Sequence, residues 1–144
     1  KYLINEPAHK RVVTYDYQDV SGGIRINFPA AIYEITVVKK EIKTITAFMY
    51  FEYKGLDTIL YKYGMPNMLS ENEFCIGRAK REIDIDIFQT LENIIYSPYS
   101  HAQLSNVKGF NTTEDYFIYL ENNQIQEKYL YSANLQLKDI VEII

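Results

Sequence analysis

The stretch AIYEITVV at residues 31–38, followed by KKE at residues 39–41 and ITAFMYFEY at residues 45–53, decides the fold of this chain. Both apolar runs are rich in β-branched and aromatic residues, which favour strands. The polar residues between them form a bend of a few residues, as is typical of antiparallel neighbours. The chain is therefore expected to be organised around an antiparallel sheet.

Further strands are predicted on both sides of this pair. Upstream, residues 12–17 and 24–28 are predicted to form a hairpin, with Ser21-Gly22-Gly23 as its turn signal. Downstream, residues 58–63 form a shorter apolar run that closes at Gly64. Together the runs predict an antiparallel meander.

The second half of the chain changes to helical spacing. Apolar residues between positions 87 and 95 recur at offsets of one, four, seven and eight, which predicts an amphipathic helix. Asp84 or Asp86 is expected to cap its start, and Ser97-Pro98 to stop it. Two further helices are predicted, within residues 111–120 and from residue 135 onward. Strands first and helices last indicate the α+β class.

Composition limits the function classes. A length of 144 residues fits one domain over residues 1–144, with residues 1–10 expected to be a flexible N-terminal segment. A net charge of −4 without a basic run argues against nucleic acid. No stretch approaches the ~20 apolar residues of a membrane helix, and no signal-peptide pattern opens the chain. The single cysteine predicts a cytoplasmic protein with a free thiol.

Most familiar catalytic motifs are missing from the sequence. It has no glycine-rich phosphate loop, no HExxH or CxxC metal pattern and no Gly-x-Ser-x-Gly nucleophile elbow. His9 and His101 lie far from Cys75 along the chain, so the sequence predicts no metal site. Cys75 is left as the obvious nucleophile, and the alternative is a buried, inert thiol.

The segment around the cysteine, MPNMLSENEFCIG at residues 65–77, resembles the active-site segment of ubiquitin-conjugating enzymes. Those enzymes carry His-Pro-Asn with the cysteine eight residues after the asparagine, as Cys75 follows Asn67 here. The chain is more closely similar to the prokaryotic ubiquitin-conjugating-like family of the PRTRC system protein B type. The further matching elements are Pro29, the Leu-Tyr-Lys-Tyr run at residues 60–63, Cys75-Ile76-Gly77 and Ser-Pro-Tyr-Ser-His at residues 97–101.

This resemblance implies a UBC-like fold, in which an antiparallel four-stranded β-meander is followed by an active-site loop and C-terminal helices. It also implies a thioester mechanism. Cys75 would be the nucleophile that carries a ubiquitin-like modifier, and Asn67 would stabilise the oxyanion. His101 would act as a base or a hydrogen-bond partner. The implied partners are a β-grasp modifier, a ThiF-type adenylating enzyme and a JAB-type protease. The alternatives are an Asx-turn role for Asn67 and simple exposure for His101.

The sequence departs from that pattern at three places. Met65 stands where the ubiquitin-conjugating enzymes have histidine, Gly77 stands where they usually have aspartate, and residues 1–10 offer no candidate for their first helix. Two other functions stay open. One is a noncatalytic binding module of the same fold with a structural cysteine, and the other is a cysteine hydrolase that uses Cys75 and His101.

Overall fold

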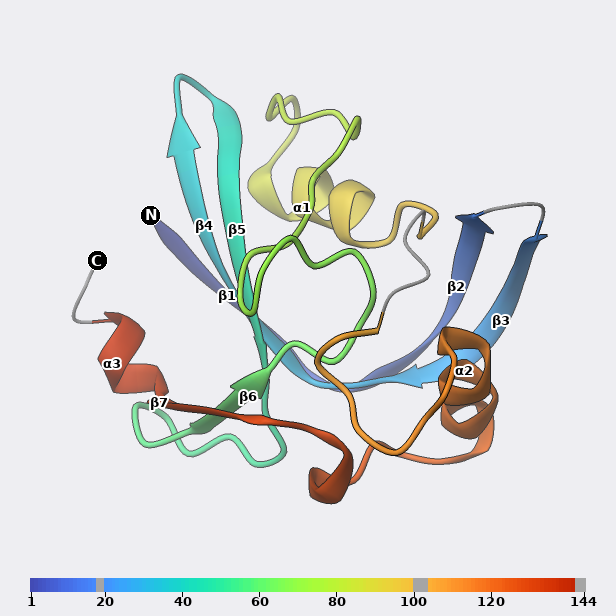
Figure 1. Cartoon of the computed structure of the whole chain (residues 1–144). Coiled ribbons are helices and arrows are strands. Elements are labelled where there is room, and N and C mark those ends of the chain that lie inside the picture. Colours follow the sequence, from blue (N-terminus) through green and yellow to red (C-terminus); the bar gives the residue numbers. More distant parts are fainter. Residues whose placement is uncertain (18–19, 100–103, 142–144) are drawn as a thin grey trace.

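The computed structural model describes residues 1–17, 20–99 and 104–141, and it belongs to the α+β class (Figure 1). Its elements are β1 (Tyr2–Glu6), β2 (His9–Tyr17), β3 (Val20–Phe28), β4 (Ala31–Val38), β5 (Glu41–Met49), β6 (Ile59–Lys62), α1 (Ile87–Ile95), α2 (Thr113–Asn122), the 3₁₀ helix η1 (Glu127–Tyr129), β7 (Ser132–Gln136) and α3 (Leu137–Val141). One antiparallel sheet has the order β1-β4-β5-β6-β7, and β2 pairs with β3 in a separate hairpin.

The strands β1 and β2 together form one long ribbon with β3 and β4. Glu6 pairs with Ala31 and His9 pairs with Phe28, so the register is the same on both sides of the interruption. Two prolines occupy the interruption, one on each strand: Pro7 and Pro29. Because proline has no backbone N–H, the ladder breaks there. In Figure 1 the ribbon bends at this point, and β2 and β3 leave the sheet.

The turn predicted at residues 21–23 is wrong, because these residues lie inside β3. Gly22 is the cross-strand partner of Tyr15, and a Cβ at Gly22 would lie 2.9 Å from the Tyr15 hydroxyl oxygen. The glycine therefore makes room for a tyrosine ring across the ribbon instead of forming a turn. Within the described residues, β2 ends at Tyr17 and β3 begins at Val20, and these two residues are cross-strand partners.

The expected four-stranded meander is instead a five-stranded sheet. Residues 1–10, expected to be flexible, contribute β1, whose Leu3 and Ile4 are half-buried against β4. At the opposite edge, residues 132–136 form β7 on β6, so the last helix begins at Leu137. Local patterns did not reveal these two strands, because an edge strand is defined by its distant partner.

The first two helices follow their predictions closely. Asp86 caps α1 by accepting the Gln89 backbone N–H at 2.7 Å, and Thr112 caps α2 by accepting the Asp115 backbone N–H at 3.0 Å. Both helices bury one face in the main core, which also contains four fully buried tyrosines: Tyr33, Tyr63, Tyr99 and Tyr116. Among the described residues, no helix has both the length and the apolar character needed to cross a bilayer.

Candidate functional site

The segment between Asn67 and Cys75 is a closed loop. The Cys75 backbone N–H donates to the Asn67 carbonyl oxygen at 2.7 Å, and the Leu69 N–H donates to the Glu73 carbonyl oxygen at 2.8 Å. The eight-residue interval is thus a short hairpin-like turn that returns the cysteine to the asparagine. The resemblance of residues 65–77 to the ubiquitin-conjugating active-site segment implies such a return of the chain.

The sheet holds this loop along β5. The Phe74 N–H donates to the Ile45 carbonyl oxygen at 2.9 Å, and the Ala47 N–H donates to the Asn72 carbonyl oxygen at 2.8 Å. Nearer the start of β5, the Ile42 N–H donates to the Arg81 carbonyl oxygen, in the segment that follows the loop, at 2.9 Å. The loop is therefore attached to the half of β5 that β6 does not pair with. A loop fixed on a rigid sheet is a common place for catalytic residues.

Cys75 is half-buried and lines a surface pocket of about 460 Å³. The other described residues around the pocket are Asn67, Ile76, Gly77, Arg78, Ala79, Ser97 and Pro98. The structure thus brings Cys75, Asn67 and the start of the 97–101 element to one place. His101, the third predicted site residue, lies outside the described residues.

Asn67 occupies a demanding position. It is buried, with 5% of its surface exposed, and its φ of 69° is left-handed. Asparagine is one of the few residues other than glycine that adopt this conformation readily, so the backbone favours it here. The neighbouring Met65, which stands in place of the histidine of the resembling enzymes, is buried in the core and packs as an apolar residue.

A tight turn follows the cysteine. The Ala79 N–H donates to the Ile76 carbonyl oxygen at 3.3 Å, and Gly77 has a φ of 60°. A positive φ at the first central residue but not at the second is the pattern of a type II′ turn, which favours glycine there. The glycine at position 77 therefore has a conformational cause, and the turn places Arg78 at the pocket.

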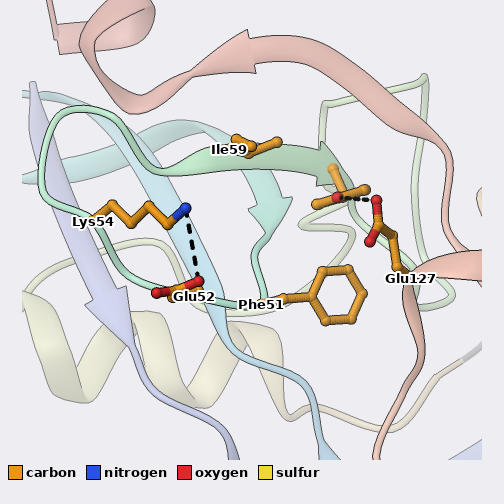
Figure 2. Close-up of a pocket in the computed structure, with 6 residues that line it drawn as sticks. Phe51, Glu52, Lys54, Ile59 and Glu127 are labelled. Carbon is orange, nitrogen blue, oxygen red and sulfur yellow. Dashed lines mark hydrogen bonds and ion pairs between the residues drawn. The ribbon is translucent and has the colours of Figure 1, made fainter.

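A second cavity, of about 190 Å³, lies beside the connection from β5 to β6 (Figure 2). Within it the Tyr61 hydroxyl donates to Glu127 Oε1 at 2.8 Å, and Lys54 pairs with Glu52 at 3.7 Å. Burial and the neighbouring Glu127 carboxylate raise the pKa of Tyr61 to about 12. Sequence reasoning missed this cavity, because its residues come from separate elements and form no motif.

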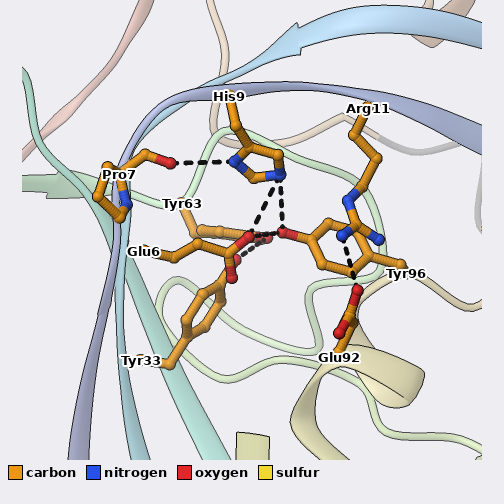
Figure 3. Close-up of polar contacts among 8 residues, drawn as sticks. All are labelled: Glu6, Pro7, His9, Arg11, Tyr33, Tyr63, Glu92 and Tyr96. Carbon is orange, nitrogen blue, oxygen red and sulfur yellow. Dashed lines mark hydrogen bonds and ion pairs between the residues drawn. The ribbon is translucent and has the colours of Figure 1, made fainter. Parts of the chain in front are cut away.

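A polar cluster joins the bend of the ribbon to α1 (Figure 3). The Tyr96 hydroxyl donates to the Glu6 carboxylate, and His9 Nε2 lies 3.3 Å from Glu6 Oε1. Arg11 pairs with Glu92 at 2.7 Å, and its guanidinium lies 3.5 Å from the centre of the Tyr96 ring. Charged groups from β1, β2 and α1 satisfy one another here, so the cluster stabilises the packing of the ribbon on the helix.

Beneath that cluster lie two tyrosines with no exposed surface. The Tyr33 and Tyr63 hydroxyls share a hydrogen bond of 2.9 Å (Figure 3), and burial raises the pKa of both well above the ordinary value.

The described residues contain no group of His, Cys, Asp or Glu suited to hold a metal ion. Cys75 and its pocket are the candidate functional site.

No protein-family model matches the chain, and neither a curated protein nor a solved structure is significantly similar to it.

Proposed function

We propose that this protein is a ubiquitin-conjugating-like enzyme of prokaryotic type that carries a ubiquitin-like modifier as a thioester on Cys75 and transfers it to an acceptor. The observation that supports the proposal is the hydrogen bond of 2.7 Å from the Cys75 N–H to the Asn67 carbonyl oxygen, made at a pocket that both residues line. It agrees with the Pro-Asn and cysteine spacing on which the resemblance rests.

The proposed chemistry consists of two acyl transfers at one sulfur. In the first, the Cys75 thiolate attacks the activated C-terminal carbonyl of the modifier, a C–S bond forms, and the activating group leaves. In the second, an acceptor nucleophile attacks the thioester carbonyl, and the C–S bond breaks with its electron pair remaining on sulfur. No metal or organic cofactor takes part in either transfer.

Asn67 has the proposed role of a hydrogen-bond donor to the oxyanion in the second transfer. Removal of a single oxyanion donor has slowed other enzymes by about 10²–10³-fold. The role of His101 as a base or a hydrogen-bond partner stays a prediction. The proposed partners are a β-grasp modifier, a ThiF-type adenylating enzyme that activates it and a JAB-type protease that reverses the conjugation.

The test of the proposal combines the purified protein with ATP and with a cognate ThiF-type adenylating enzyme and β-grasp protein. We expect a covalent adduct of the two proteins that reductant removes. Cys75→Ala should form no adduct, whereas Cys75→Ser should give an oxyester that resists reductant and is cleaved by hydroxide. Ser70→Ala, at the tip of the same loop, serves as the matched control and should behave as the wild type. Absence of an adduct with cognate partners of demonstrated activity would contradict the proposal.

A noncatalytic binding module is the second candidate function, and one observation favours it. The connection from β5 to β6, together with the first residue of β6, exposes four large apolar side chains that could contact a partner protein: Phe51, Tyr53, Leu56 and Ile59. Alkylation of Cys75 separates the two candidates. A thiol that reacts only after denaturation would favour the binding module, because an acyl carrier needs an accessible sulfur.

A further inference from the structure

The segment that follows Cys75 carries three cations, and two of them have acceptors within the chain. Lys80 pairs with the Asp84 carboxylate, and Arg81 donates to a backbone carbonyl oxygen at 3.2 Å. Arg78 makes no ion pair or side-chain hydrogen bond with any residue that the structure describes, and it lines the Cys75 pocket. Its guanidinium is therefore available to a ligand in a way that the other two cations are not.

The charge of this pocket is opposite to that of the protein as a whole. The chain carries a net charge of −4, yet Arg78 is the one charged side chain among the described residues that line the pocket. A guanidinium has five N–H donors in a planar fork that matches a carboxylate. Because none of the described residues around the pocket is acidic, Arg78 gives the pocket a local attraction for anions.

The turn after the cysteine keeps Arg78 at this place. Ile76 and Ala79 close the turn through their backbone, so Arg78 sits three residues from Cys75 on a fixed backbone. The side chain is exposed. It can therefore be changed without disturbing the core, which makes its role open to direct test.

We propose that Arg78 makes the Cys75 pocket selective for reactants that carry a carboxylate, and that the acceptor is an amine flanked by aspartate or glutamate in a peptide segment. The statement about the acceptor rests on the proposed function. In that step the amine lone pair attacks the thioester carbonyl and a C–N bond forms. The C–S bond breaks, its electron pair stays on Sγ as the thiolate, and the proton of the attacking amine passes to solvent.

The selectivity can be measured without any partner protein, by comparing two alkylating reagents. Iodoacetate and iodoacetamide both form a C–S bond with the Cys75 thiolate and release iodide, but only iodoacetate carries a carboxylate. In the wild type, the ratio of the iodoacetate rate to the iodoacetamide rate should exceed that of Arg78→Gln by about three- to tenfold at low salt. Added salt should reduce the difference, and Arg78→Lys should keep most of it.

Lys80→Gln is the matched control, because it removes a cation two residues further along the chain that is paired and does not line the pocket. It should leave the ratio near the wild-type value, which separates a local effect from a change in net charge. Equal ratios in the wild type and in Arg78→Gln would overturn the proposal. So would a loss in Lys80→Gln as large as that in Arg78→Gln.

The acceptor class is tested by discharge of the thioester. Lysine peptides flanked by glutamate should react several-fold faster than peptides flanked by glutamine, and Arg78→Gln should abolish this preference. A thioester that forms but shows no preference would overturn the inference about the acceptor and leave the proposed function intact. If no thioester forms with active cognate partners, the proposed function fails, and the alkylation ratio alone decides whether Arg78 selects carboxylates.

Discussion

The hydroxyl groups of Tyr33 and Tyr63 lie 2.9 Å apart in the core, where each is a hydrogen-bond partner of the other. Tyr33 belongs to β4, whereas Tyr63 directly follows β6, so the bond spans the sheet beneath the connection that leads to Cys75. Both rings are fully buried. Removal of either hydroxyl therefore leaves the other buried without its hydrogen-bond partner, which lowers the free energy of unfolding.

We expect Tyr33→Phe and Tyr63→Phe each to lower the free energy of unfolding by about 1–2 kcal/mol, because each leaves one buried hydroxyl without its partner. The double variant should lose clearly less than the sum of the two. Urea unfolding of the four proteins measures this coupling. Additive losses would show that the two hydroxyls do not depend on each other.

The buried tyrosines also predict how stability varies at alkaline pH. Burial raises the pKa of Tyr33, Tyr63, Tyr99 and Tyr116 above the ordinary value near 10. Below pH ~10 these phenols keep their protons in both states, so their contribution to stability is complete. Above it the unfolded chain releases protons that the folded chain retains, so the free energy of unfolding falls as pH rises.

Tyrosinate absorbance and far-ultraviolet circular dichroism, followed together in an alkaline titration, check this. The sequence has 14 tyrosines and no tryptophan, so the tyrosinate signal is free of indole absorbance. The tyrosines that ionise at the highest pH should do so together with loss of secondary structure. Complete ionisation of all tyrosines with the secondary structure intact would contradict the expectation.

Substitutions at Asn67 can separate its backbone role from its proposed chemical role. Because its φ is 69°, Asn67→Ala should destabilise the protein by about 1 kcal/mol, whereas Asn67→Gly, which tolerates that φ, should cost less. Both variants lack the amide and should discharge the thioester slowly. Thermal unfolding measures the change in stability, and single-turnover discharge of the thioester measures the change in rate. If Asn67→Gly discharged at the wild-type rate, the side chain would have only the turn role.

The turn after Cys75 gives a prediction about Gly77. Nothing lies within 4 Å of a Cβ built at this position, so Gly77→Ala meets no steric obstacle, but its φ of 60° is unfavourable for alanine. We expect a loss of about 1 kcal/mol in the free energy of unfolding. Chemical denaturation measures it, with Gly55→Ala as a control, since Gly55 has a φ of 59° and equally open surroundings. A neutral Gly77→Ala beside a destabilised Gly55→Ala would refute the turn assignment.

The parts of this structure that the sequence predicted are those set by local chemistry. The helix over residues 87–95 and its Asp86 cap depend on spacing and on one side chain. The return of Cys75 to Asn67 depends on the length of one loop. Each of these features is contained within about ten neighbouring residues, where propensity and turn chemistry act directly.

The parts that were missed depend on distant partners. The strands β1 and β7 are short edge strands, and their pairing is decided by β4 and β6. In the sequence Gly22 is typical of a turn, and only the structure shows that Tyr15 lies opposite it in the ribbon. The sequence does not distinguish Arg78 from the other cations of its loop. Only the structure shows that Arg78 lines the Cys75 pocket and that Lys80 is paired.

The common register of the ribbon has a consequence for how the chain folds. Because β2 with β3 and β1 with β4 keep the same pairing, the ribbon can close from its tip toward Tyr2 by contacts that form one after another, with little loop entropy lost at each step. The pairing of Leu60 with Leu135 joins segments far apart in the chain and has no such local route. We therefore expect the ribbon to form early and the docking of β7 on β6 to limit the folding rate.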